Sequence, residues 1–217
     1  MNHIPRNYTA QPKTKEELQA LIEAEINIRG NQCDLNHIDV SLISNFSDLF
    51  FESKFNGDIS GWDVSNMVHS VTMFKGSKFN RDISRWDVSR VTDMSDMFCM
   101  SKFKSDISGW DVSGVEYMYA MFASSKFNGD ISRWNVSKVK NMRGMFCGSK
   151  FEGDISSWDR SSVTDDELMF FNSKIAKKMG INKLSFEQVK SYYQNLKLES
   201  DLQEAFPGQS QTSKVRL

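Results

Sequence analysis

The sequence has little of the chemistry that enzymes and membrane proteins require. No apolar run of about 18 residues occurs, so we expect no transmembrane helix and no membrane partner. The 217 residues include only 3 histidines and 3 cysteines. No histidine (His3, His37, His69) is spaced from a cysteine or serine in a usable catalytic pattern, and no glycine-rich phosphate loop is present. We therefore expect no enzymatic activity, no cofactor and no metal site.

An excess of charge of one sign is also absent. Lys+Arg is 27 and Asp+Glu is 28, which gives a formal net charge of -1. A general nucleic-acid binder usually has a strong basic excess, so we expect no direct nucleic-acid partner. The first residues, Met1–Arg6, lack the apolar segment of a secretory signal. This predicts a cytoplasmic location, with a secreted or surface location as the alternative.

What the sequence does contain is an internal repeat of 24 residues. Segments similar to Ser101–Ser113 begin at Ser53, Ser77, Ser125 and Ser149. The tryptophans all keep the same step: Trp62, Trp86, Trp110, Trp134 and Trp158. A fixed period in this range is typical of solenoids and arrays. With a degenerate first unit and a decaying last one, six units occupy residues 29–172.

Each unit combines two hydrophobic periodicities. Trp110 and Val112 alternate with polar residues after Ile107, as in a strand with one buried face. Apolar residues between Val115 and Phe122 recur at the spacing of a short helix. The sequence therefore predicts an α/β solenoid: a right-handed, leucine-rich-repeat-like stack of six 24-residue coils with one parallel sheet and helical caps.

Both ends of the repeat region carry signals for capping helices. Thr14 and Glu17 form a capping box that opens a helix over 15–29, and a second box at Ser185 opens a helix to about Leu196. The predicted regions are an N-terminal arm and capping helix (1–30), the repeat solenoid (31–174), a C-terminal helical cap (175–206) and a disordered tail (207–217). The helices are expected to close the open ends of the stack.

The three cysteines are expected to be free thiols. Cys99 and Cys147 occupy the same repeat position two coils apart. At ~4.8 Å per coil they would lie ~10 Å apart, which is too far for a disulfide. Together with Cys33 they make an odd number. We expect all three to be mostly buried.

The repeat word F-N-x-D-I-S-x-W-D-V-S, followed by V-x-x-M-x-x-M-F, resembles the BspA-like leucine-rich-repeat family, also described as mycoplasma lipoprotein-associated or PARCEL repeats. The resemblance covers about Asn31 to Lys174. It implies a leucine-rich-repeat-like fold, found in host-associated bacteria, some protists and mobile elements. Many members are surface proteins with a signal or a lipid anchor, and the resemblance implies no shared catalytic site.

The outward positions of the expected strand form a polar column. Aspartate or asparagine stands there in each coil, and arginine flanks it in alternate coils. Two explanations stay open: each carboxylate accepts hydrogen bonds from nearby backbone or hydroxyl groups, or the column is an acidic stripe for a basic partner. We predict partner binding on this strand face, through Asp63, Arg85, Asp87, Asp111, Arg133, Asn135 and Asp159.

A lysine column runs along another edge of the stack. It consists of Lys54, Lys78, Lys102, Lys126, Lys150 and Lys174. It could follow phosphates, but an aspartate stands four residues after each of the first five lysines. We favour a solvated edge that these aspartates neutralise.

These features predict a non-catalytic protein–protein interaction module whose partner is another protein. It would bind and occlude its target as an intracellular regulatory, immunity or phage anti-defence protein of bacteria. The alternatives are a nucleic-acid mimic that uses an acidic strand face, and a bacterial surface adhesin. A regular scaffold with varying outer side chains and no catalytic constellation supports the first of these.

Overall fold

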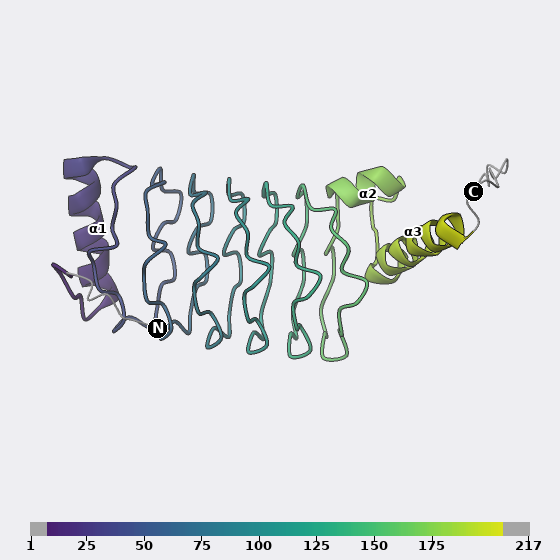
Figure 1. Cartoon of the computed structure of the whole chain (residues 1–217), viewed down its shortest axis with the longest axis horizontal. Coiled ribbons are helices and arrows are strands. Elements are labelled where there is room, and N and C mark those ends of the chain that lie inside the picture. The colour runs from purple at the N-terminus through teal and green to yellow at the C-terminus, as the bar shows by residue number, and fades with distance from the viewer. Residues whose placement is uncertain (1–7, 206–217) are drawn as a thin grey trace.

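The computed structural model describes residues 8–205 as a row of stacked coils with a helix at one end and two at the other (Figure 1). Helix α1 (Lys15–Arg29) precedes the coils, and α2 (Lys174–Met179) and α3 (Phe186–Ala205) follow them. We number the coils 1 to 6, at residues 29–52, 53–76, 77–100, 101–124, 125–148 and 149–172. The core is one continuous column of apolar side chains inside the coils.

Residues of one kind stack on their counterparts 24 positions away. The Phe79 and Phe103 rings lie 6.3 Å apart at 5°, and the Trp62 and Trp86 rings 6.4 Å apart at 6°. Each tryptophan Nε1 also donates to a carbonyl of the preceding coil, as Trp110 does to Ile83 at 3.1 Å. The tryptophans therefore fill the core and tie neighbouring coils together. The 24-residue period and the buried aromatic ladder are confirmed.

The last eight residues of each coil, which we call the ladder segment, carry most of the backbone contact between coils. Four alternate amides of one segment donate to four alternate carbonyls of the next. In coil 3 the donors are Met94, Asp96, Phe98 and Met100, and the acceptors in coil 4 are Tyr117, Tyr119, Met121 and Ala123, at 2.7–2.9 Å. The same four bonds recur at each junction from coil 1 to coil 6. All the donated N–H groups point toward the C-terminal end of the stack.

The predicted α/β solenoid with a parallel sheet is wrong, and with it the leucine-rich-repeat architecture. Residues 8–205 contain isolated parallel bridges, such as Asp93 with Tyr117, but no β-strand and no sheet. The expected strand is too short to extend, because the Trp110 amide bonds back to the Ile107 carbonyl at 3.1 Å and closes a turn. Most of the bridges lie instead in the ladder segments; Ala10 with Ile38 and Asp34 with Asp58 are the exceptions.

The short helix expected in each coil is also replaced by turns. Ala120 and Ser124 have φ of 48° and 54°, and a residue in this left-handed region ends a right-handed helix. The amides of Met121 and Ala123 accordingly bond three residues back, to Met118 and Ala120. Apolar spacing of three and four residues fits such turns as well as it fits a helix, so the pattern was misread.

Helix α1 begins and ends where the sequence predicts. Thr14 Oγ1 accepts from the Glu17 amide at 3.2 Å, and the helix stops before Gly30, whose φ is 82°. The Glu17 carboxylate accepts from the Lys13 amide at 2.7 Å, one residue earlier than in a standard capping box. The local signals for this helix therefore hold with one change of partner.

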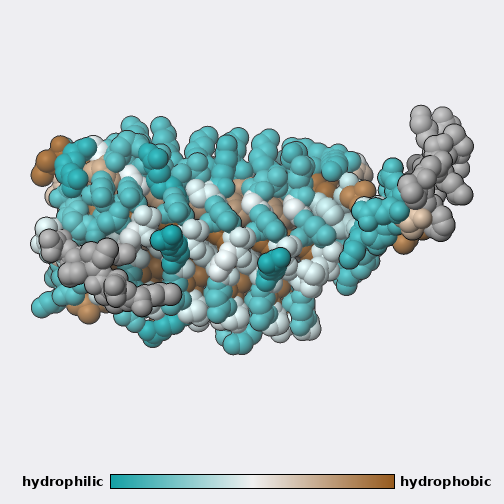
Figure 2. Space-filling model, viewed as in Figure 1, coloured by the Kyte–Doolittle hydropathy of each residue, from teal (hydrophilic) through white to brown (hydrophobic). Residues whose placement is uncertain are grey.

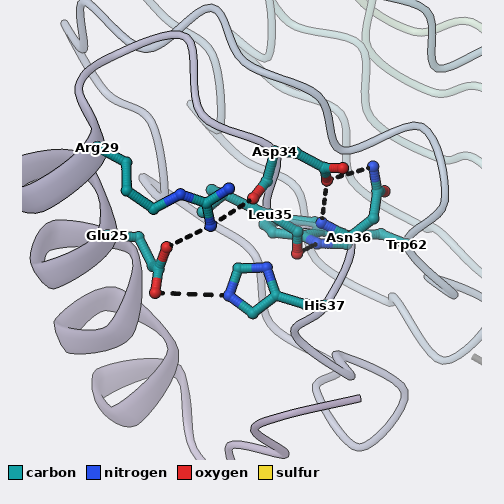
Figure 3. Close-up of polar contacts among 7 residues, drawn as sticks. All are labelled: Glu25, Arg29, Asp34, Leu35, Asn36, His37 and Trp62. Atoms are coloured by element: carbon teal, nitrogen blue, oxygen red, sulfur yellow. Dashed lines mark hydrogen bonds and ion pairs between the residues drawn. The ribbon is translucent and has the colours of Figure 1, made fainter. Parts of the chain in front are cut away.

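An ion-pair cluster joins α1 to coil 1 (Figure 3). The Glu25 carboxylate lies 2.8 Å from Arg29 Nη1 and 3.5 Å from His37 Nε2. Arg29 also donates to the Asp34 carbonyl at 3.3 Å. The hydrogen bond from Arg29 and the nearby His37 lower the pKa of Glu25. With Leu18 of α1 fully buried against the core, these contacts close the N-terminal end of the stack.

The C-terminal helices follow the predicted start but not the predicted lengths. Ser185 and Gln188 form the expected capping box, with bonds of 2.9 and 3.3 Å. Helix α3 then runs to Ala205 without a break, beyond the predicted end near Leu196. Helix α2 was not predicted; Ser173 caps it by accepting from the Ala176 amide at 3.2 Å. Figure 1 shows α3 projecting away from the stack.

The N-terminal arm is in part a continuation of the stack. The Thr9 amide donates to the His37 carbonyl at 2.9 Å, and the Asp39 amide donates to Ala10 at 2.8 Å. Residues 1–7 and the predicted disordered tail (207–217) lie outside the described residues. Among the helices described, none combines the length and hydropathy needed to cross a membrane.

Candidate functional site

The predicted binding residues lie on one outer face, which we call the aspartate face. Asp87 Oδ1 accepts from the Ser89 amide at 3.0 Å and from the Ser89 hydroxyl at 2.6 Å. Each position of the column makes the same amide bond to the serine two residues on, at 3.0–3.2 Å: Asp63, Asp87, Asp111, Asn135 and Asp159. These are Asx turns, so the hydrogen-bonding explanation accounts for the column.

The aspartate face is exposed, and the hydrogen bonds of its turns favour the ionised form of the carboxylates. The Ser113 hydroxyl and amide lower the pKa of Asp111, and the Ser161 amide does the same for Asp159. Arg85 and Arg133 are exposed beside the column. Within residues 8–205 neither arginine forms an ion pair with it. The structure thus brings the predicted residues onto one face as separate side chains, one or two per coil.

The lysine column is exposed, but its expected neutralisation is wrong in detail. The described ion pair in this column joins Lys174 to Glu152 at 3.0 Å. The aspartates four residues after the lysines are used in a second set of Asx turns. Asp82, Asp106 and Asp130 each accept from the amide of the serine two residues on, at 2.9 Å. These carboxylates shape the backbone instead of pairing with lysine.

A second outer face, formed by the outward side chains of the ladder segments, differs from coil to coil; we call it the ladder face. Tyr117 and Tyr119 of coil 4 are 42% and 43% exposed, while Met118 between them is fully buried. The two rings therefore leave the same side of the segment. Both sit in the middle of the stack, where the backbone ladder holds the main chain on either side. They are the exposed aromatic residues of the central coils.

Ion pairs between neighbouring coils surround the two tyrosines. Lys75 lies 3.0 Å from Asp96, and Lys140 lies 2.7 Å from Glu116. The hydrogen bond to Asp96 raises the pKa of Lys75, and the bond to Glu116 raises that of Lys140. A further pair joins Arg143 to Glu167. The ladder face thus presents two aromatic rings within a frame of paired charges. In the view of Figure 2, most of the surface of the molecule is hydrophilic.

Residues that could do covalent or metal chemistry are not gathered in the described part of the chain. The three cysteines are free, as predicted; Cys33 and Cys99 are buried, and Cys147 is half-buried. Burial and the Asp96 carboxylate raise the pKa of Cys99 to about 12, so its thiol stays protonated. Within residues 8–205, no group of three His, Cys, Asp or Glu side chains could hold a metal ion.

The tyrosines of the ladder face were missed because they stand in a segment read as a short helix. One signal was present in the sequence. Of the five tyrosines, Tyr117 and Tyr119 are the two within the repeats. They also interrupt repeat positions that hold no aromatic residue except His69 in the other coils, such as Ser95 at the position of Tyr119. A departure from the repeat at an outward position was the available indication of a site.

Comparison with known families agrees with the repeat. The family model described as "Mycoplasma protein of unknown function, DUF285" matches residues 18–125 and again 99–207. The two matches overlap and together cover most of the chain, as expected of a repeat protein. The chain therefore belongs to this family. No curated protein and no solved structure matches it.

Proposed function

We propose that this chain is a non-catalytic module that binds another protein, and that the ladder face around Tyr117 and Tyr119 makes the contact. The exposure of these two rings on a hydrogen-bonded scaffold is the observation that carries the proposal. Tyrosine and arginine are enriched among the residues that dominate binding energy at protein interfaces. A rigid backbone also lowers the entropic cost of ordering the surface on binding.

The pattern of ion pairs supports the same surface. Lys75–Asp96 is a partly buried pair and Glu116–Lys140 is an exposed one, and a partner could extend them into a polar rim. The aspartate face offers less, because its carboxylates are engaged by their own turns. That engagement weakens the alternative of a nucleic-acid mimic. The surface adhesin gains no support from the described residues.

The biological setting belongs to the same proposal. We infer a cytoplasmic protein that occludes its target, in a regulatory, immunity or phage anti-defence role. We also propose that the chain is related to the BspA-like repeats, because it carries the repeated motif F-N-x-D-I-S-x-W-D-V-S. The absence of catalysis is likewise part of the proposal.

The test is affinity purification of the full chain from its native cell with mass spectrometry, using variants drawn from the chain's own repeats. Tyr117→Asn introduces the residue that coils 1 and 5 carry at this position. Tyr119→Ser, combined with it, introduces the residue that coils 1 and 3 carry at the second position. Asp87→Asn with Asp111→Asn removes charge but keeps the turn, as Asn135 does. The substitutions therefore disturb the fold little.

We expect a stoichiometric partner that the tyrosine variant loses and the asparagine variant keeps. The reverse result would contradict the ladder-face proposal and place the contact on the aspartate face. A partner retained by both variants would contradict both assignments. Near-identical melting temperatures of the three proteins are the control, since surface substitutions of this kind usually change stability by less than about 0.5 kcal/mol.

A further inference from the structure

The ladder ends at coil 6 with a row of backbone amides that have no acceptor within residues 8–205. In coils 1 to 5 each of the four ladder amides donates to the next coil, as Met142, Gly144, Phe146 and Gly148 do to coil 6. The corresponding amides of coil 6 are those of Asp166, Leu168, Phe170 and Asn172. None of them donates a hydrogen bond to any described residue. Three of the four residues are exposed, and Phe170 is buried.

This open edge has a direction as well as a spacing. Each ladder carbonyl and the following amide belong to one peptide group, so four rows of peptide dipoles run through the stack with their N–H ends at coil 6. Aligned peptide dipoles leave a partial positive charge at the free N–H end. Coil 6 is also where the ladder segment opens with three acids in succession, Asp165, Asp166 and Glu167. Their charge complements the dipoles.

A cavity adjoins the edge. It has a volume of about 280 Å³ and lies between the ladder segment of coil 6 and the beginning of α3. Its apolar walls include Leu168 and Phe171, which are 38% and 39% exposed, and Leu184 and Phe186 on the opposite side. Because α3 projects away from the stack (Figure 1), it does not supply a seventh ladder segment.

We propose that this edge binds an extended peptide segment of a partner protein. Carbonyls at alternate residues of the peptide accept from the amides of Asp166, Leu168, Phe170 and Asn172, with the peptide parallel to the chain. One apolar side chain enters the cavity, and a lysine or arginine lies against Glu167, whose side chain is 61% exposed, since Asp166 is already paired with Arg160. Addition of an extended segment to an open backbone edge is a general mode of peptide recognition.

The existing junctions favour this occupant. At the junction of coils 5 and 6 the same register places Arg143 beside Glu167, so a cation already matches this acid from the other side. A second copy of the chain could offer only its coil 1 carbonyls, and α1 closes that end with Leu18 and Ile22 buried. The site is separate from Tyr117 and Tyr119 and goes beyond the ladder-face proposal.

The first measurement is amide hydrogen exchange on the full chain. The amides of 166, 168, 170 and 172 should exchange much faster than the equivalent amides of 142, 144, 146 and 148, because among the bonds of the described part of the chain the latter donate and the former do not. Slow exchange at coil 6 without added peptide would overturn the proposal. Slow exchange that is lost on dilution would assign the edge to a second copy, and slow exchange independent of concentration would assign it to the chain itself.

The second measurement adds an acetylated and amidated peptide with the sequence of residues 141–148, carrying Cys147→Ser. It holds Arg143, Met145 and Phe146 in the register of a ladder segment. We expect saturable binding by fluorescence anisotropy and slowed exchange at the coil 6 amides. The same peptide with Arg143→Glu should bind at least about tenfold more weakly. Absence of binding, or equal binding of the two peptides, would overturn the proposal.

Protein variants from the chain's own repeats locate the site. Leu168→Gly and Phe171→Lys introduce residues that coils 5 and 2 carry at the same positions, Gly144 and Lys75, so both should fold. Each should weaken peptide binding about tenfold. Phe51→Lys, at the position of Phe171 in coil 1 and 47% exposed, should leave it unchanged. Equal effects of Phe171→Lys and Phe51→Lys would contradict a site at coil 6. Tyr117→Asn with Tyr119→Ser should not affect this peptide, which separates the two proposals.

Discussion

The two outer faces of the coils depend on their side chains to different degrees. On the aspartate face an Asx turn needs a side-chain acceptor, and aspartate or asparagine occupies the column in every coil. On the ladder face the hydrogen bonds that every junction shares are made by the backbone. At the position of Tyr117, an asparagine or aspartate makes an Asx turn in four coils, but His69 and Tyr117 cannot, and the backbone bonds at every junction are the same: the four are Asn45, Asp93, Asn141 and Asp165. The ladder face can therefore change its side chains without losing its backbone bonds, whereas the aspartate column keeps its acceptor in every coil.

The largest effect should come from breaking an inward column that every coil from 2 to 6 shares. Trp110→Ala removes a buried ring from the middle of the stack and its bond to the Ile83 carbonyl. We expect a loss of about 3–5 kcal/mol in the free energy of unfolding, measured by urea denaturation. Trp110→Phe should cost less, because most of the packing stays. A loss under about 1 kcal/mol for the alanine variant would contradict a buried tryptophan ladder.

Two substitutions with smaller and opposite effects on stability test whether the backbone conformation of the ladder segments determines their stability. Gly148 and Met100 occupy the same ladder position with φ of 64° and 57°. A side chain in this region costs about 1–2 kcal/mol, so Gly148→Ala should destabilise and Met100→Gly should stabilise by about that amount. The added methyl at Gly148 would also lie 3.1 Å from Ser124 Oγ. Met100→Ala, which keeps the strain, is the control. Changes of the same sign at both positions would contradict the comparison.

Two buried serines at equivalent positions of coils 3 and 4 test whether every repeated position contributes to stability. Ser101 Oγ accepts from the Phe103 amide at 3.4 Å, but Ser77 Oγ has no hydrogen-bond partner among the described residues. Ser101→Ala should cost about 0.5–1.5 kcal/mol, and Ser77→Ala should be neutral or stabilising, because a buried hydroxyl without a partner is unfavourable. Differential scanning calorimetry of the two variants measures this. Equal losses would show that the two serines have the same role.

The 24-residue repeat could be predicted from the sequence, because the buried positions hold the same residue type in successive coils. The tryptophans and the phenylalanines of the core repeat at 24 residues, and their stacking follows. Thr14 and Ser185 open helices as predicted, since a cap is a local interaction between residues three apart. These features depend on neighbours in sequence or on identical positions in adjacent coils.

The secondary structure inside the coils and the ladder face could not be predicted in the same way. Left-handed residues at Asp96, Met100, Ala120 and Ser124 have no glycine to mark them, and the conformation is held by bonds to the adjacent coils. At the equivalent positions of coils 2 and 5 the left-handed residue is a glycine: Gly76, Gly144 and Gly148. The open edge at coil 6 was invisible for a similar reason, because it depends on where α3 leaves the stack.

The smallest expected effect is the contribution of the aspartate charge in the Asx turns to stability. Replacing aspartate by asparagine separates this charge from the hydrogen bond that the side chain accepts. Serine amides and hydroxyls lower the pKa of Asp82, Asp106 and Asp130 below 3.8. A lowered folded-state pKa stabilises fully above the unfolded value, and the stabilisation is lost as pH falls through the folded value. The melting temperature of the wild-type chain should therefore fall as pH drops below about 4. A triple Asp→Asn variant at these positions keeps the acceptor without titrating, as Asn141 does for Arg143 at 2.9 Å, and should lose less between pH 5 and pH 3. An equal acid loss in both proteins would mean that other carboxylates, such as Glu25 at the α1 junction, carry the acid sensitivity.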